Sequence, residues 1–236
     1  MSERVQVPLG EDSATLPAVL WRPESGRGPG IVLLQEIFGL SPYIHRRAAD
    51  LAAAGYVVVA PQIFWRLGVD AVPDGPGMLE AGVDLVTRLD WPAAVADGCA
   101  TLSWLRARDE VVGGVGVVGF CFGGALGYQV AAQAGADALV SYYGSALPML
   151  VDTVPVVSAP SQHHFGEADS YLDTAAVARI REVVLGPGAS GATEFHTYPG
   201  ADHAFDNADF VLHDAAASAV AWPRTVDFLH RLLPVG

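Results

Sequence analysis

The sequence contains no lysine, and all 13 of its basic residues other than histidine are arginines. Without lysine, a chain can neither form a Schiff base with a substrate nor supply a P-loop lysine, which excludes pyridoxal-type and Walker-type chemistry. Negative charge dominates, because 26 acidic residues against 13 arginines give a formal net charge of −13. No basic run occurs, so we expect neither nucleic acid nor a membrane surface as a partner.

Cysteine is almost as rare. Two cysteines, Cys99 and Cys121, are too few for a disulfide framework, and residues 1–5 carry charge without the apolar run of a secretion signal. A reduced, cytoplasmic location is therefore expected. The uncharged stretch 111–136 is interrupted by eight glycines and predicts a strand, a turn and a helix instead of a membrane span. Zinc-ligand spacing is missing, so we expect neither a metal nor another cofactor.

The residues that are present favour a folded α/β protein. Half of the 236 residues (51%) are hydrophobic, which is enough to bury a large core. Short β-branched runs alternate with longer helical patterns, and they predict one domain over residues 1–236, with a mostly parallel sheet and helices on both faces. The predicted strands are 31–34, 56–60, 115–118, 137–143, 159–165 and 194–198. Helices are predicted over 42–55, from Pro92, over 125–134 and 172–184, and at the C-terminus, where Pro223 should kink or restart the helix.

A glycine-rich turn around Cys121 is the strongest local signal. Residues 119–124 read Gly-Phe-Cys-Phe-Gly-Gly and stand between a predicted strand and a predicted helix. This is the pattern of a nucleophile elbow, in which small neighbours permit a strained backbone at the nucleophile. Glycine packing and a phosphate-binding turn are the alternatives, although the G-x-G-x-x-G spacing is not present. By contrast, Cys99 lies on the apolar face of a predicted helix and is interpreted as a core residue.

A thiol nucleophile requires a base and an acid that orients the base, and in this fold class both follow the nucleophile in the chain. Asp169 follows a predicted strand and is our candidate acid, with Glu167 and Asp173 as rivals. His203 lies in a loop after the last predicted strand and is our candidate base. The other histidines are interpreted as packed or surface residues: His45, His163, His164, His196, His213 and His230.

The segment after the first predicted parallel strand supplies further candidates. Glu36 lies at the carboxyl end of that strand, where α/β sheets place their active sites, although it can equally be a charge near the following helix. The backbone N–H of Ile37 is positioned to donate to an oxyanion, as is the N–H of Phe122, which follows Cys121 directly.

Taken together, four segments closely resemble the dienelactone hydrolase (carboxymethylenebutenolidase) family. They are Gln-Glu-Ile-Phe-Gly at 35–39, the elbow at 119–124, the acid segment 166–169, and Gly-Ala-Asp-His-Ala-Phe at 200–205. The similarity extends from about residue 15 to the C-terminus. Each motif is weak by itself, but the four in this order form a specific pattern.

This resemblance implies an α/β-hydrolase fold with a Cys121–His203–Asp169 triad. In that family, the glutamate that matches Glu36 activates the thiol by taking its proton when substrate binds. The resulting thiolate attacks a lactone carbonyl, an enolate leaves, and water then releases the acyl group from the enzyme. This order is chemically reasonable, because only the thiolate form of cysteine is strongly nucleophilic.

The chain departs from the family at the two arginines that bind the substrate carboxylate. Neither the region of residues 78–80 nor the ten residues after His203 contain arginine, and Asp206 stands three residues past the histidine. Arg66 and Arg88 are possible substitutes, although each is equally interpretable as a surface residue. This departure favours neutral lactones or esters over anionic ones. Four aromatic residues could line an apolar pocket, or belong to the core: Phe38, Trp65, Tyr143 and Phe205.

Three functions follow from these patterns. The first is a cysteine-dependent hydrolase of lactones or small carboxylic esters, acting on a small molecule as a monomer or small homo-oligomer. The second is a non-catalytic relative that binds a small ligand through the same fold. The third is acyl or thioester transfer by the same triad, which differs from hydrolysis only in the acceptor.

Overall fold

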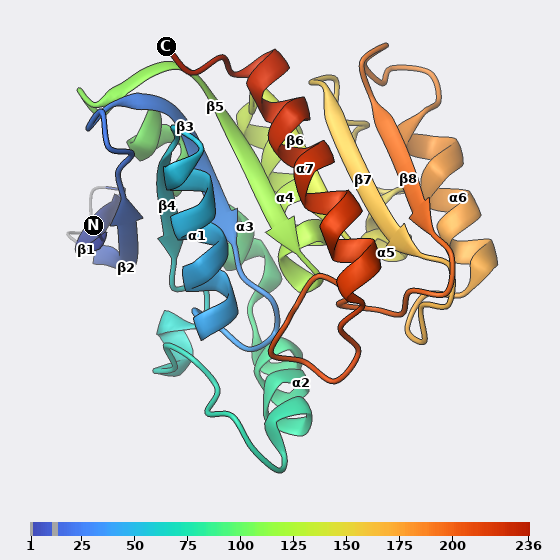
Figure 1. Cartoon of the computed structure of the whole chain (residues 1–236). Helices are drawn as coiled ribbons and strands as arrows, with labels where there is room; N and C mark the ends of the chain where they lie inside the picture. Colours follow the sequence, from blue (N-terminus) through green and yellow to red (C-terminus); the bar gives the residue numbers. More distant parts are fainter. Residues whose placement is uncertain (1, 11–13) are drawn as a thin grey trace.

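The computed structural model describes residues 2–10 and 14–236, so residue 1 of the N-terminal segment considered above lies outside the described residues. An eight-stranded sheet forms the centre of the molecule (Figure 1). Its strands are β1 (Ser2–Leu9), β2 (Ala14–Trp21), β3 (Gly28–Leu34), β4 (Val57–Pro61), β5 (Val111–Phe120), β6 (Ala138–Tyr142), β7 (Ser161–Gly166) and β8 (Glu194–Tyr198). They lie in the order β1-β2-β4-β3-β5-β6-β7-β8.

All six predicted strands are confirmed, and they form the parallel part of the sheet from β4 to β8. Strands β3, β4, β6 and β7 are buried along their whole length, as expected of strands covered on both faces. Valine-rich runs such as Val57–Ala60 suit this position because β-branched side chains pack well on a pleated, buried surface.

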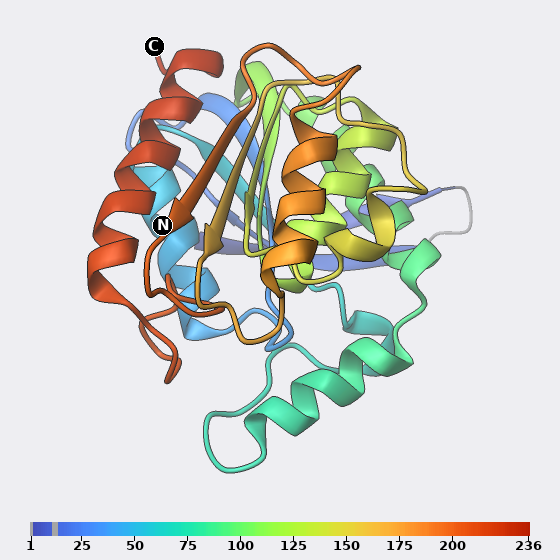
Figure 2. The same cartoon turned by 90° about the vertical axis from the view of Figure 1, so that its right-hand side faces the viewer.

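Helices cover both faces of the sheet, which confirms the predicted α/β architecture (Figure 2). The helices are α1 (Pro42–Ala53), α2 (Met78–Arg88), α3 (Trp91–Arg106), α4 (Phe122–Ala134), α5 (Leu147–Leu150), α6 (Thr174–Val184) and α7 (Ala215–Leu232). Figure 2 shows α1 and α7 on one face, with α3, α4 and α6 on the other. None of the helices in the described ranges 2–10 and 14–236 is long and apolar enough to cross a membrane.

Some parts of the fold were not predicted, and the C-terminal helix does not restart at Pro223. The antiparallel hairpin of β1 and β2 escaped detection because β1 is an edge strand with a mostly exposed, polar pattern. Helix α2 also escaped detection; its glycine, Gly82, weakens the helical pattern. Pro223, in contrast, lies inside α7, and the helix continues through it from Ala215 to Leu232.

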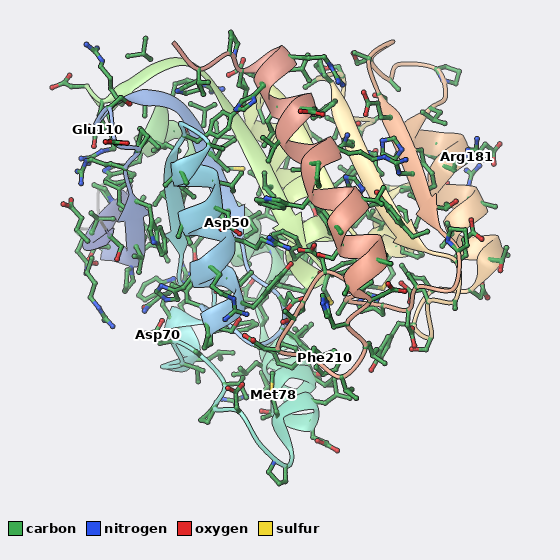
Figure 3. The ribbon with its side chains drawn as sticks, in the orientation of Figure 1. Asp50, Asp70, Met78, Glu110, Arg181 and Phe210 are labelled. Atoms are coloured by element: carbon green, nitrogen blue, oxygen red, sulfur yellow. The ribbon has the colours of Figure 1, made fainter. Side chains whose placement is uncertain are left out.

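The carboxyl ends of the parallel strands point toward one edge of the molecule, where the site lies. Helix α2 and the loop between β8 and α7 meet below that edge in Figure 1. Figure 3 labels one residue of each, Met78 at the start of α2 and Phe210 in the loop. Ligands of open α/β sheets bind outside the carboxyl ends of the strands, so this edge is the expected place for chemistry.

Candidate active site

Cys121 occupies the tight turn that joins β5 to α4. Its backbone has φ 53° and ψ −117°, a conformation that residues other than glycine rarely adopt. Two glycines make the turn possible: a Cβ on Gly119 would overlap the carbonyl of Gly123, and one on Gly123 would overlap the carbonyl of Leu34. The elbow is therefore packed against the end of β3, and the sulfur lies at the positive end of the 13-residue helix α4.

The structure brings the predicted acid, base and thiol into one chain of contacts. His203 Nε2 lies 3.1 Å from Cys121 Sγ, and His203 Nδ1 lies 2.8 Å from Asp169 Oδ2. The other Asp169 oxygen accepts the backbone N–H groups of Tyr171 and Leu172, each at 2.9 Å. This carboxylate is fully buried, so its contacts fix the tilt of the imidazole ring.

The two rival acids lie elsewhere. Glu167 accepts a hydrogen bond from the Thr197 hydroxyl at 2.7 Å, and Asp173 caps α6 by accepting from the Ala176 N–H. Neither contacts His203 in the described structure, which leaves Asp169 as the acid paired with the histidine.

The charge state of His203 depends on its two partners. Burial lowers the pKa of His203, but the Cys121 sulfur and the hydrogen bond with Asp169 outweigh burial and raise it to about 10. The ring is thus predominantly cationic at neutral pH. This cationic ring lies 3.1 Å from the Cys121 sulfur.

Glu36 is buried, and its carboxyl group lies among polar side chains near His203. Burial raises the pKa of Glu36 to about 7, although the His203 charge and a hydrogen bond from Asn207 oppose that rise. The Asn207 amide donates to one Glu36 oxygen at 2.7 Å, and the Tyr143 hydroxyl donates to the other at 3.4 Å. No hydrogen bond joins Glu36 to Cys121 among the described residues. A carboxyl with this pKa can both accept and return a proton near pH 7.

Backbone strain is concentrated around this site. Cys121, Tyr143 and Ala204 are the non-glycine residues with positive φ in the described ranges, with values of 53°, 36° and 54°. Tyr143 follows β6 and bonds to Glu36, while Ala204 follows His203 directly. Such conformations persist only where the surrounding structure enforces them, and they gather at functional sites.

Two backbone N–H groups beside Cys121 remain available for a ligand. Neither the Ile37 N–H nor the Phe122 N–H donates a hydrogen bond to any of the residues that the structure describes. Phe122 opens α4, and Ile37 lies in the turn after β3. Unpaired N–H groups at these two places match the requirements of an oxyanion hole.

A cavity of about 150 Å³ opens above the sulfur. Cys121, His203 and Glu36 form its floor, and apolar side chains form most of its wall: Ile37, Phe38, Leu79, Val83, Ala204 and Phe210. Phe38, one of the tentative substrate-binding residues, lines this cavity. No arginine lines this cavity, so it offers no cation to a substrate carboxylate other than the histidine itself.

The structure corrects three of the tentative substrate-binding residues. Both terminal guanidinium nitrogens of Arg66 donate to the carboxylate of Asp97 on α3, and Nη2 does so at 3.0 Å. The Trp65 indole N–H donates to the same carboxylate at 2.9 Å. Both side chains are thereby held away from the cavity. Phe205 is fully buried and packs in the core against Tyr198, with the ring centroids 4.9 Å apart. None of these three lines the cavity.

Neither Arg88 nor Asp206 lines the cavity. Arg88 pairs with Asp84 on the exposed side of α2, at 2.9 Å, and so does not replace the missing family arginines. Asp206 faces away from the cavity and is fully buried. Arg47 binds it with two nitrogens at 2.7 and 2.8 Å, and Tyr43 donates to it at 2.6 Å. The Asp206 charge is thus neutralised internally and does not repel an anionic substrate directly.

Three residues of the site were missed by the sequence analysis. The Ser145 hydroxyl lies 3.6 Å from the Cys121 sulfur, and the Tyr171 ring contacts His203 edge-on, with centroids 4.9 Å apart. Asn207 holds Glu36. Asn207 could have been noticed as the polar residue four positions after His203, but Ser145 and Tyr171 follow strands with no motif of their own.

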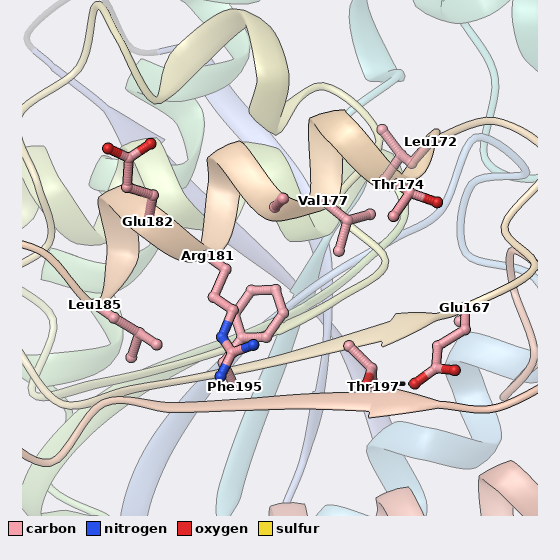
Figure 4. A pocket seen from close by; sticks show the side chains of 11 residues that line it. Glu167, Leu172, Thr174, Val177, Arg181, Glu182, Leu185, Phe195 and Thr197 are labelled. Atoms are coloured by element: carbon pink, nitrogen blue, oxygen red, sulfur yellow. Dashed lines mark hydrogen bonds between the residues drawn. The ribbon is translucent and has the colours of Figure 1, made fainter.

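A different hollow lies at the far edge of the sheet, between α6 and β8 (Figure 4). Its volume is about 650 Å³, and Arg181 lies there over the ring of Phe195, with 5.9 Å from the guanidinium carbon to the centroid. Cys121, His203, Asp169 and Glu36 do not line it, although the rival acid Glu167 does. Within residues 2–10 and 14–236, no group of three or more His, Cys, Asp or Glu residues could hold a metal ion.

The fold and the cysteine elbow, with an acid and a histidine later in the chain, define a protein of the α/β-hydrolase class. Comparison with known proteins gives the family. The model of the dienelactone hydrolase family matches residues 16–233, and the chain belongs to that family. It is 34% identical to carboxymethylenebutenolidase 1 of Cupriavidus pinatubonensis, over 91% of each chain. A carboxymethylenebutenolidase of Pseudomonas putida is 33% identical, over 92% of each chain.

Solved structures show the same fold at lower identity. A dienelactone hydrolase from Anabaena variabilis superposes with a TM-score of 0.71 at 20% identity, over 99% of this chain and 98% of the other. A dienelactone hydrolase-like promiscuous phosphotriesterase from metagenomic libraries gives a TM-score of 0.80 at 22% identity, with the same coverage. These likenesses confirm the predicted α/β-hydrolase fold.

Proposed function

We propose that this protein hydrolyses neutral lactones and small carboxylic esters through a covalent intermediate on Cys121. The observation that carries the proposal is the contact chain from Asp169 through His203 to Cys121, with distances of 2.8 and 3.1 Å. A histidine that touches both a nucleophile and an orienting acid is the arrangement used for acyl transfer. The names of the relatives, carboxymethylenebutenolidases, support a lactone as one substrate class.

The proposed reaction begins with attack of the Cys121 thiolate on the carbonyl carbon, which forms a carbon–sulfur bond. The carbonyl oxygen becomes an oxyanion and accepts hydrogen bonds from the backbone N–H groups of Ile37 and Phe122. Each such donor typically raises the reaction rate by a factor of about 10²–10³. When the carbon–oxygen bond of the ester breaks, the leaving oxygen takes a proton from His203.

Water completes the cycle. Neutral His203 removes a proton from a water molecule, which attacks the thioester carbon, so the carbon–sulfur bond breaks and the thiolate is regenerated. Where Cys121 is in its thiol form and His203 already carries a proton, the Glu36 carboxylate accepts the thiol proton and returns it after the acyl group is released, because its pKa of about 7 permits transfer in both directions. The cavity favours uncharged substrates, since none of its lining residues is an arginine.

Hydrolysis of 4-nitrophenyl acetate tests the proposal, with Cys121→Ala and Cys99→Ala as matched variants. Cys99 is half-buried on α3 and does not line the cavity, so its replacement should leave turnover within about twofold. Removal of Cys121 should lower kcat by at least about 1,000-fold, since loss of a nucleophile removes the covalent route. Mass spectrometry of the quenched reaction should find one acetyl group on Cys121. Unchanged turnover in Cys121→Ala would refute the proposal.

A further inference from the structure

A second apolar cavity, of about 360 Å³, lies beside the one above Cys121. It has no part in the mechanism described so far. Its walls come from α2, α5 and the starts of α3 and α4, and include Val86, Trp91, Phe122, Ala146, Met149 and Leu150. No ionisable side chain lines it. Met149 is 73% exposed and marks the outer end of the cavity.

The two cavities are neighbours because they share lining residues. Ile37 and Ser145 line both, and Ile37 is one of the two residues assigned to the oxyanion hole. Helix α2 also borders both: Val83 lines the cavity above the sulfur, and Val86, one turn further along the same helix, lines the second. A substrate carbonyl placed between the Ile37 and Phe122 N–H groups would therefore border both cavities.

The position of His203 decides which half of an ester enters which cavity. His203 lines the cavity above Cys121 and is not among the residues that line the second. Because His203 must protonate the leaving oxygen, the alcohol half has to lie in the cavity that contains it. The acyl half then extends to the other side of the oxyanion hole, into the second cavity.

We infer that the second cavity is an acyl-chain site, and that the protein prefers linear esters with an uncharged, apolar acyl chain of several carbons. The inference rests on the proposed function and adds its substrate class. Apolar walls and the lack of an ionisable group both favour a hydrocarbon chain over a carboxylate. Full burial of each added CH₂ group corresponds to a gain of about fourfold in kcat/KM, from the usual transfer free energy of about 0.8 kcal/mol.

The test compares 4-nitrophenyl acetate, butanoate and hexanoate, which share one leaving group, with the 4-nitrophenyl monoester of adipic acid, which places a carboxylate at the chain end. For the native protein, kcat/KM should rise about two- to fourfold per CH₂ group, and the adipate monoester should be a poor substrate. Met149→Arg places a cation at the outer end of the cavity. It should lower the hexanoate-to-acetate ratio of kcat/KM about tenfold and raise the adipate-to-hexanoate ratio by a similar factor.

Val220→Arg is the matched control, because Val220 is exposed on α7 and lines neither cavity. Its two ratios should equal those of the native protein. Equal ratios in Met149→Arg and Val220→Arg, with Cys121-dependent hydrolysis of the acetate intact, would overturn the acyl-chain site and leave the proposed function standing. Acetate hydrolysis that persists in Cys121→Ala would instead overturn the proposed function itself.

Discussion

Replacing Glu36 with glutamine should make the protein more stable, and increasingly so as the pH rises. Glu36 is buried, and its pKa rises from 4.5 to about 7 on folding. A raised carboxyl pKa means that stability is greatest below pH 4.5, where the group is protonated in both states, and is lost as the pH rises through 7. At about 1.4 kcal/mol per pKa unit, burial of the charged carboxylate costs about 3 kcal/mol at pH 8. Glutamine carries no charge and avoids that penalty.

Urea unfolding of both proteins at pH 5 and pH 8 measures this effect. The quantity compared between the two pH values is the free energy of unfolding of Glu36→Gln minus that of the native protein. The stability advantage of Glu36→Gln over the native protein should grow by roughly 2–3 kcal/mol between the two pH values. Contacts of the amide that do not depend on pH cancel in this comparison. Glu80→Gln, which removes an exposed carboxylate on α2, serves as the control. If this stability advantage grows by less than about 0.5 kcal/mol between pH 5 and pH 8, folding does not raise the pKa of Glu36 as described. The argument that Glu36 exchanges a proton near pH 7 would then fail as well.

Three further variants test other parts of the site. Gly123→Ala should destabilise the fold by about 2 kcal/mol or more and abolish activity, because its Cβ would push the elbow from β3; thermal unfolding and the ester assay read both effects. Asp206→Ala leaves the Arg47 charge without its buried partner and should lower stability by about 3–5 kcal/mol in urea, whereas Asp206→Asn should lower it by less. Ser145→Ala removes a hydroxyl 3.6 Å from the Cys121 sulfur and should slow alkylation by iodoacetamide at pH 7 severalfold; an unchanged rate would show that this hydroxyl does not influence the reactivity of the sulfur.

Local sequence predicted those parts of the fold that depend on local preference. The parallel strands appear as runs such as Val57–Ala60 because a strand buried on both faces has to be apolar at every position. Helix α1 appears at Ser41 and Pro42 because the fixed φ of proline suits a helix start. The β1–β2 hairpin gives no such signal, since its outer strand is mostly exposed and obtains its shape by pairing with β2.

The site divides in the same way. Cys121, Asp169 and His203 could be predicted because each stands in a motif directly after a strand, and the strand order brings those ends together. Arg66 could not be placed, because its partner is Asp97, 31 residues further along the chain on another helix. Nothing near Arg66 in the sequence records that pairing. The same holds for Ser145, which reaches the sulfur only through the turn after β6.

The three strained residues, Cys121, Tyr143 and Ala204, should give the candidate site a different thermal behaviour from the sheet. Each holds a backbone conformation that costs of order 1–3 kcal/mol and relaxes once its surroundings loosen. We therefore expect warming to disorganise the surroundings of Cys121, His203 and Glu36 while the central strands are still paired. Heat inactivation should precede the loss of secondary structure in this protein, and a brief excursion above its working temperature should be reversible for as long as the strands persist.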